Sequence, residues 1–281
     1  MDKPAGMTSH DVVQRVRRAL GTRAAGHTGT LDPFATGLLV VLVGRATRLA
    51  QYVEGQPKTY LATARLGIRT TTDDLTGEPI GPETVEPASE LRVREALAEF
   101  LGTHPQRPPQ YSAKRIGGER SYRKARRGEA VHLADVSVTV HYIELLEYRP
   151  PMLEFRITVS AGTYIRAIAR DLGERLGVGG HLTQLRREAI GPLGVEQAVP
   201  VDRVTSAALI PPRSVLSDLP AVELDEPTRQ AVAHGRPVVD GRATGQRGPG
   251  AMVALMAAGE LVGVAREHEG WLRPTVVLET P

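Results

Sequence analysis

The sequence of 281 residues contains no cysteine, few aromatic residues and no long apolar run. The absence of cysteine excludes disulfide frameworks, thiolate zinc sites, iron–sulfur clusters and cysteine nucleophiles. No apolar run approaches the ~20 residues that a membrane-spanning helix needs. The first residues, MDKPAGMTSHD, do not form the apolar core of a signal peptide. We therefore expect a cytoplasmic protein without membrane contacts.

The composition is typical of a folded globular protein, because 41% of the residues are hydrophobic and 24% are charged. The eight histidines are scattered without the spacing of metal ligands, so we assign no metal. The phosphate-binding patterns GxxxxGK[ST] and GxGxxG are both missing around the segment that stands out below, residues 26–40. This argues against a nucleotide-hydrolysing loop.

Positive charge is concentrated in one segment of the chain. The net charge is only +3, but residues 107–127 contain eight basic residues and a single acid, Glu119. After residue 220, six arginines stand against eight acids, so the first 220 residues carry a balance of +5. Arginine binds phosphates and stacks on bases, so the basic segment indicates nucleic-acid binding. A solvated charged hairpin is the alternative interpretation.

The hydrophobic pattern predicts a mixed α/β fold. Thr8, with Asp11 three residues later, resembles a capping box and predicts a helix over 11–20. The apolar run 38–43 predicts one buried strand. Other predicted elements are helices near 46–53, 89–101, 163–176 and 227–233, and strands over 60–66, 136–147, 153–160, 252–256, 261–266 and 275–278. The Pro-rich stretch that ends at Pro220 predicts a domain boundary there.

The segment Gly26–Val40, GHTGTLDPFATGLLV, places a single carboxylate among small and turn-forming residues. This carboxylate, Asp32, comes just before the predicted buried strand. From the residue types alone two interpretations are open. Asp32 either caps its own backbone in a tight Asp-Pro turn or carries chemistry.

This segment resembles the catalytic segment of the TruB family of tRNA pseudouridine-55 synthases. Five further segments resemble the family in the same order, namely DKPAGMTSHDVV at 2–13, KTYLATARLGIRTTTDDLTG at 58–77, PPQYSAKRIGGERSY at 108–122, GTYIRAIARDLGERLG at 162–177 and GGHLTQLRR at 179–187. Together they cover most of residues 1–190. The last ~60 residues resemble a small PUA-like β domain in length and pattern.

The resemblance implies an α/β (α+β) fold with two domains. A pseudouridine synthase-like catalytic domain with a mixed, largely antiparallel sheet is expected over 1–220, including an RNA-binding arm at about 104–130. A small PUA-like RNA-binding β domain is expected over 221–281. The implied enzyme is an isomerase that acts as a monomer. It converts uridine-55 to pseudouridine in the T-arm stem-loop of tRNA after the base is flipped out. No cofactor is expected, because the reaction has no net redox change and adds no outside group.

The resemblance also assigns roles to individual residues. It implies that Asp32 is the nucleophile, that Tyr60 lies against the target base, and that Arg166 pairs with the Asp32 carboxylate. A guanidinium keeps a carboxylate ionised and oriented, and the Tyr60 hydroxyl is suited to assist removal of the C5 proton. The residues expected to bind the substrate are Lys3, His27, Tyr164, Arg123, Lys124, Arg126 and Arg127. Packing roles remain open for Tyr60, His27 and Tyr164, and a surface position for Arg166.

Two other functions remain open at this point. One is a relative that works in a guide-RNA particle, although such relatives carry longer termini and basic tails. The other is a tRNA-binding folding factor, whose RNA binding would survive the loss of Asp32.

Two segments depart from the expected pattern. Family members have a short apolar strand before the DKP motif, whereas this sequence begins at the motif. We therefore expect this strand to be shorter here, or a few residues to lie upstream, and we expect Lys3 to face a phosphate. The adjacent carboxylates in Thr70–Asp74 suggest a metal site, but without a histidine or further acids we expect a solvated turn.

Overall fold

The computed structural model describes residues 1–84, 86–112, 115–116, 119–120, 127, 133–239 and 250–279. The chain forms two compact units that alternate along the sequence. Unit 1 consists of residues 1–33, 38–55 and 190–281, and unit 2 consists of residues 34–37 and 56–189. The chain therefore passes from unit 1 into unit 2 immediately after Pro33, the residue that follows Asp32.

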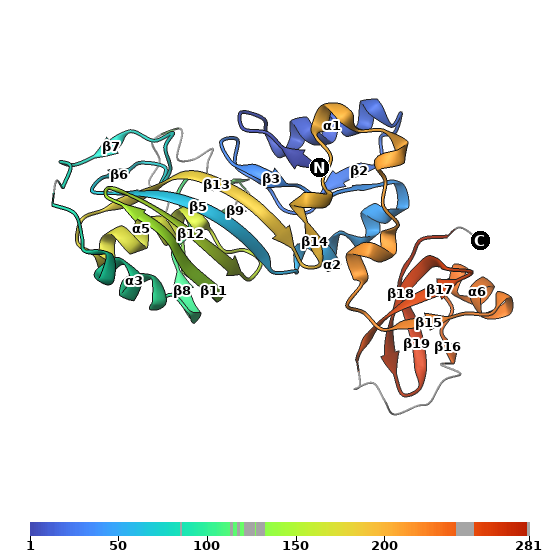
Figure 1. Cartoon of the computed structure of the whole chain (residues 1–281). Helices are drawn as coiled ribbons and strands as arrows, with labels where there is room; N and C mark the ends of the chain where they lie inside the picture. Colours follow the sequence, from blue (N-terminus) through green and yellow to red (C-terminus); the bar gives the residue numbers. More distant parts are fainter. Residues whose placement is uncertain are drawn as a thin grey trace. The chain divides into compact units, whose positions relative to one another are not determined.

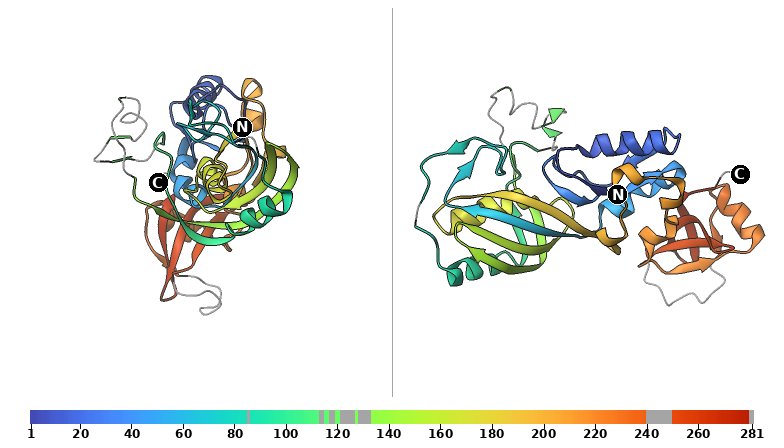
Figure 2. Two further views of the ribbon diagram at one scale, coloured as in Figure 1. Left: turned by 90° about the vertical axis from the view of Figure 1, so that its left-hand side faces the viewer. Right: turned by 45° about the horizontal axis from the view of Figure 1, so that its top comes forward.

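Unit 2 is built on a sheet with the strand order β3-β13-β5-β12-β11-β8. These strands are β3 (Thr36–Leu38), β5 (Lys58–Leu66), β8 (Gly102–Gln106), β11 (Val136–Arg149), β12 (Met152–Val159) and β13 (Gly180–Ile190). The pairs β5–β12, β12–β11 and β11–β8 are antiparallel, and β13 runs parallel to β3. Helix α5 (Ile165–Arg175) packs against β5, and Figure 2 shows it on the concave side of the sheet.

Three shorter features complete unit 2. Helix α3 (Glu90–Ala98) contacts both β11 and α5. Strands β6 (Arg69–Thr70) and β7 (Pro79–Ile80) form a hairpin. The pair β9 (Arg115–Ile116) and β10 (Glu119–Arg120) lies within the basic segment. The chain therefore forms a hairpin ladder at the point where the sequence has its Gly-Gly turn.

The N-terminal part of unit 1 confirms the predicted capping box. Helix α1 begins at Ser9, where the Thr8 hydroxyl accepts a hydrogen bond from the Asp11 N–H at 3.1 Å and the Asp11 carboxylate accepts from the Thr8 N–H at 2.9 Å. The elements of this part are β1 (Asp2–Lys3), α1 (Ser9–Ala19), β2 (Ala25–His27), β4 (Val41–Val43), η1 (Gly44–Leu49) and α2 (Ala50–Glu54). Later in the chain follow β14 (Leu193–Gly194), η2 (Val195–Gln197), η3 (Val201–Arg203), η4 (Ser206–Ala208) and η5 (Pro212–Leu216).

The prediction of one continuous strand over 38–43 is wrong. Strand β3 ends at Leu38 and pairs with β13, whereas β4 begins at Val41 and pairs with β2. Between them the Leu39 N–H donates to the Met1 carbonyl, and the Val40 carbonyl accepts from the Thr28 N–H. The apolar run is buried as expected, but it is divided between two ladders.

The C-terminal part of unit 1 is a five-stranded sheet with the order β15-β17-β18-β19-β16 (orange to red in Figure 1). Its elements are β15 (Ala221–Glu223), α6 (Glu226–Ala233), β16 (Val238–Val239), β17 (Met252–Ala257), β18 (Glu260–His268) and β19 (Trp271–Val277). One face forms a core with Val232 of α6. The other face packs on apolar residues that include Leu42, Leu49 and Leu216.

This second core ties the C-terminal sheet to the N-terminal part of unit 1. Arg48 donates to the Val277 carbonyl at 2.7 Å, and the Tyr52 and Thr275 hydroxyls lie 2.8 Å apart. The compact units thus follow a different division from the sequence boundary near Pro220, and the functional division into 1–220 and 221–281 stays a prediction. The predicted fold class is confirmed, since the fold is mixed α/β with antiparallel-rich sheets and a C-terminal β domain.

Candidate active site

The backbone before Asp32 is fixed by the first residue of α1. Asp32 lies in unit 1, in the loop between β2 and β3, and is partly exposed. The Ser9 hydroxyl accepts a hydrogen bond from the Leu31 N–H at 2.9 Å and donates to the Leu31 carbonyl at 3.2 Å. Both Ser9 and Leu31 are buried. A single side chain therefore satisfies both backbone groups of the residue before Asp32.

The backbone after Asp32 is held by Lys3, which is fully buried. Its ammonium group donates to the carbonyls of Pro33 at 3.2 Å, Pro4 at 2.9 Å and Met7 at 2.8 Å. The Pro33 carbonyl also accepts from the Gly6 N–H at 2.8 Å. An ammonium group has three protons to donate, so these carbonyls use all of them. This position does not support the expectation that Lys3 faces a phosphate.

His27 lies at the end of β2, opposite Val41 of β4, and is partly exposed. The next residue, Thr28, is fully buried, and its N–H donates to the Val40 carbonyl at 3.1 Å. The β2–β4 hairpin thus fixes the backbone at His27. Its expected place beside flipped nucleotides stays a prediction.

Tyr60 lies on β5 of unit 2, opposite Ile157 of β12, and is only 6% exposed. It shares the buried side of the strand with Lys58 and Ala62. Within the part of the chain that the structure describes, no hydrogen bond to its hydroxyl is found. The environment of the ring is that of a core residue, so its contact with a target base stays a prediction.

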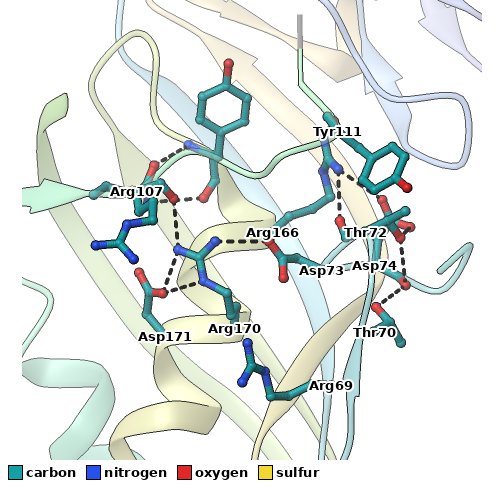
Figure 3. Close-up of polar contacts among 12 residues, drawn as sticks. Arg69, Thr70, Thr72, Asp73, Asp74, Arg107, Tyr111, Arg166, Arg170 and Asp171 are labelled. Atoms are coloured by element: carbon teal, nitrogen blue, oxygen red, sulfur yellow. Dashed lines mark hydrogen bonds and ion pairs between the residues drawn. The ribbon is translucent and has the colours of Figure 1, made fainter. Parts of the chain in front are cut away.

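Arg166 lies in the first turn of α5 and is 5% exposed. Its guanidinium donates to the carbonyls of Thr72 and Tyr111, both at 3.0 Å, and lies 3.4 Å from a carboxylate oxygen of Asp74 (Figure 3). The interpretation of Arg166 as a surface residue is therefore wrong. Its pairing with Asp32 stays a prediction.

The loop that carries Asp74 is not the solvated turn expected from the sequence. Asp74 is 4% exposed. Its carboxylate accepts hydrogen bonds from the Thr72 hydroxyl at 2.7 Å and from the N–H and hydroxyl of Thr76 at 2.9 and 2.6 Å. The threonines of this segment supply the donors that permit a carboxylate to be buried, which the sequence interpretation did not consider.

Tyr164 occupies the N-cap position of α5, and its side chain is partly exposed. Its backbone is bracketed by the buried side chain of Gln106, which donates to the Tyr164 carbonyl at 3.2 Å and accepts from the Tyr164 N–H at 2.9 Å. The observed contacts of Tyr164 thus concern its backbone. Substrate binding by its ring stays a prediction.

The basic arm is only partly within the described chain. Arg127 is exposed, whereas Arg123, Lys124 and Arg126 and the basic helix expected around them lie outside the described residues. The hairpin pairing Ile116 with Glu119 is compatible with an arm at this position. RNA binding by the four basic side chains stays a prediction.

Sequence reasoning missed Asp73 and Arg170. The Arg170 guanidinium donates to Asp73 at 3.0 Å and to Asp171 at 2.7 Å. Burial raises the pKa of Asp73, and the attraction of Arg170 opposes this effect without cancelling it. One signal was available in the sequence, because Arg166 and Arg170 are spaced by one helical turn and lie on one face.

Two general searches of the described residues gave negative results. In those parts of the chain, no group of three or more His, Cys, Asp and Glu side chains is arranged to hold a metal ion. Within the same parts, no helix has the length and apolar character needed to cross a membrane.

Comparisons with known proteins agree with the motifs in the sequence. The model of the TruB family pseudouridylate synthase N-terminal domain matches residues 17–165, and that of the tRNA pseudouridylate synthase B C-terminal domain matches residues 166–219. The tRNA pseudouridine synthase B of Thermobifida fusca (strain YX) is 44% identical and that of Synechococcus sp. (strain WH7803) is 41% identical. Each alignment covers 99% of this chain and 96% of the relative.

Solved structures are similar over the same length. An H/ACA RNP bound to a substrate RNA containing 2′-deoxyuridine includes a chain with 26% identity and a TM-score of 0.77, and a Cbf5-Nop10-Gar1 complex includes one with 28% identity and a TM-score of 0.76. Both comparisons cover 99% of this chain and 83% and 84% of the other. With family models and relatives spanning nearly its whole length, the chain belongs to the TruB family of pseudouridine synthases.

Proposed function

We propose that this protein isomerises uridine-55 to pseudouridine in the T loop of tRNA, with Asp32 as the nucleophile. Relatives at 40–44% identity over the whole chain are tRNA pseudouridine synthases B. The observation that carries the proposal is the fixed backbone on both sides of Asp32, held by Ser9 and Lys3. A nucleophile gains rate when its position is set before the substrate arrives.

The proposed reaction breaks the N1–C1′ glycosidic bond of uridine and joins C1′ to C5 of the same uracil. The proton on C5 leaves and N1 gains a proton, so the product is an isomer of the substrate. A carboxylate is suited to attack or stabilise an electron-poor sugar carbon, as it does in glycosidases. Here the uracil must be retained rather than replaced by water. One carboxylate is therefore sufficient, and no cofactor is required.

Tyr60 and Arg166 have supporting roles in this proposal. Arg166 orients the carboxylate of Asp32, and Asp74 and two backbone carbonyls hold its guanidinium in a fixed direction. Tyr60 stacks on the flipped uracil, and its hydroxyl assists the removal of the C5 proton. The absence of a hydrogen bond to this hydroxyl within the described residues is compatible with that role.

We also propose that RNA contacts are divided between two regions. The basic arm binds the T-arm stem-loop and offsets the few kcal/mol that base flipping costs. The C-terminal sheet binds an outlying part of the tRNA. We propose that the enzyme works as a monomer and in the cytoplasm, where its substrate is present.

A rival function is that of a tRNA-binding folding factor. The two functions are distinguished by Asp32→Asn, which keeps the shape of the side chain and removes its nucleophilicity. We expect single-turnover pseudouridine formation on unmodified tRNA to fall by about 10³-fold or more, while tRNA affinity changes little. Asp202→Asn is the matched control, because Asp202 is an exposed residue of the same unit.

The assay maps pseudouridine at each position of the tRNA, with no added cofactor. Wild-type activity at position 55 and its loss in Asp32→Asn support the proposal. Undiminished turnover by Asp32→Asn would remove Asp32 from the reaction. Tight binding by wild-type protein without any product would favour the folding factor.

A further inference from the structure

Arg170 connects three segments of unit 2 that are far apart in the sequence (Figure 3). Its guanidinium donates to Asp73 in the β6–β7 loop at 3.0 Å and to the Arg107 carbonyl at 2.8 Å. It also donates to Asp171, its neighbour on α5, at 2.7 Å. The Arg107 carbonyl lies at the start of the basic segment 107–127. One side chain thus joins the loop, the helix and the entrance of the proposed RNA-binding arm.

Arg166 joins the same loop and the same entrance one helical turn earlier. It contacts Asp74 and the Thr72 carbonyl on one side and the Tyr111 carbonyl on the other. The side chain of Gln106 also brackets the backbone of Tyr164. Segment 106–111 is therefore held at three points along α5. The last of these points is Arg170, to which the proposed reaction gives no role.

The contacts of Arg170 are nearly buried, with 12% of its side chain and 15% of that of Asp73 exposed. Burial raises the pKa of Asp73 and of Asp171, so both carboxylates depend on Arg170 to remain ionised. Buried ion pairs contribute little net stability, because desolvation offsets their attraction. Their geometry is nevertheless specific, since a guanidinium donates in fixed directions in one plane. These contacts are better suited to fix positions than to stabilise the fold.

The backbone of Asp73 is an independent sign of constraint. Its φ is +59°, in the left-handed region that residues other than glycine rarely adopt. Its carbonyl accepts a hydrogen bond from the Leu182 N–H at 3.1 Å. A strained residue persists only where its surroundings hold it, and such residues cluster at functional sites.

We propose that Arg170 is a positioning residue that sets the entrance of the arm relative to Arg166. This inference rests on the proposed function and adds a residue to it. Arg170 touches neither the base nor Asp32 in this proposal. It acts by keeping the β6–β7 loop and segment 106–111 in register, so that Arg166 keeps its direction when the arm binds RNA.

The first test is Arg170→Lys, which keeps the charge and loses the planar set of donors. We expect the single-turnover rate on a saturating T-arm stem-loop to fall by about 10- to 100-fold, since small misplacements at a site have effects of this size. Asp73→Asn provides a second variant that preserves the shape of the loop, and its rate should fall in the same direction. Arg175→Lys is the control, because Arg175 on the same helix pairs with Glu99 and lies over the Phe100 ring, away from the loop. Its rate should stay within about twofold.

A double-mutant cycle distinguishes positioning from loss of folding. In the Arg166→Lys background, Arg170→Lys should lower the rate by only about threefold or less, because the residue through which it acts is already altered. A full and independent effect in both backgrounds would overturn the inference. So would a wild-type rate in Arg170→Lys. Each variant is tested at a temperature where its thermal unfolding curve shows it to be folded.

The wild-type reaction separates this inference from the function on which it rests. If the wild-type protein forms no pseudouridine, the proposed function is overturned and the inference about Arg170 with it. If the wild-type protein is active and Arg170→Lys equals it, only the inference about Arg170 is overturned.

Discussion

The two units hold their candidate residues in different ways. In unit 1 the loop of Asp32 is fixed by Lys3 and Ser9, which come from one short stretch at the start of the chain. In unit 2 Arg166 is fixed by buried charge and by carbonyls from two segments that lie 94 and 55 residues away along the sequence. The first arrangement depends on hydrogen bonds to backbone groups, and the second on side chains that must stay ionised. Mutations should therefore affect stability in unit 1 and orientation in unit 2.

The largest effect that tests this comparison is expected at Arg166. Arg166→Lys keeps the charge but cannot reach Asp74 and two carbonyls with the same geometry. We expect the single-turnover rate on the T-arm stem-loop to fall by about 100-fold, with little change in the free energy of unfolding. Arg156→Lys is the control, because Arg156 pairs with Glu188 at a partly exposed site of the same unit. A rate within about twofold of wild type would show that orientation of Arg166 is not required.

The opposite result is expected at Lys3. Lys3→Met keeps a long side chain but leaves the carbonyls of Pro33, Pro4 and Met7 without their donor. The free energy of unfolding should fall by about 2–4 kcal/mol, because buried acceptors are left unsatisfied. Urea unfolding measures this loss as a lower midpoint with an unchanged slope. Ser9→Ala should lose less, about 1–2 kcal/mol, since one neutral hydroxyl is removed.

The comparison between the units fails if these two results are exchanged. An unfolding free energy equal to that of wild type in Lys3→Met would mean that the three hydrogen bonds do not stabilise the loop. A large loss of stability in Arg166→Lys would mean that its contacts serve the fold.

The same contrast explains what the sequence could predict. The capping box at Thr8 and Asp11 is a local pattern, and the structure confirms it. The family motifs placed Asp32 in a loop before a buried strand, and the loop lies there. The burial of the run 38–43 was predictable from its composition. Its division into β3 and β4 was not, because the division depends on pairing with β13 and β2.

Contacts between distant segments explain the remaining errors. Two adjacent aspartates in a threonine-rich segment have the composition of a solvated turn. Asp74 is buried because Arg166 lies within 3.4 Å of it, and these residues are far apart in the sequence. Lys3 was expected at a phosphate because lysine is rarely buried, and only the fold reveals the three carbonyls that receive it.

The smallest expected effect concerns the C-terminal sheet, where removal of residues 221–281 would be a poor test. This sheet shares an apolar core with Leu42, Leu49 and Val53, close in sequence to the Asp32 loop. Truncation would expose that core and destabilise unit 1. Substitutions on the exposed part of the sheet avoid this difficulty.

A pair of arginines offers such substitutions. Arg266 and Arg273 are directly opposite each other on β18 and β19, and both are exposed. Like charges in this position are unfavourable, yet neither side chain has a hydrogen bond or ion pair within the chain that the structure describes. Trp271, which is 46% exposed, is paired with His268 on the same ladder. Two unpaired cations beside an exposed indole ring are suited to an RNA strand.

The last prediction therefore concerns the double variant Arg266→Gln/Arg273→Gln. Each lost phosphate contact should reduce the slope of log affinity against log salt by about 0.7–0.9, so the double variant should lose up to about 1.4–1.8 for full-length tRNA. The T-arm stem-loop should bind as it does to wild type, because in our proposal only full-length tRNA reaches this sheet. The control Arg229→Gln/Arg236→Gln removes the same charge at α6 and beyond it, and should leave both slopes unchanged. Equal losses for the two RNAs would place the C-terminal sheet beside the T-arm and contradict the proposed division of RNA contacts between arm and sheet.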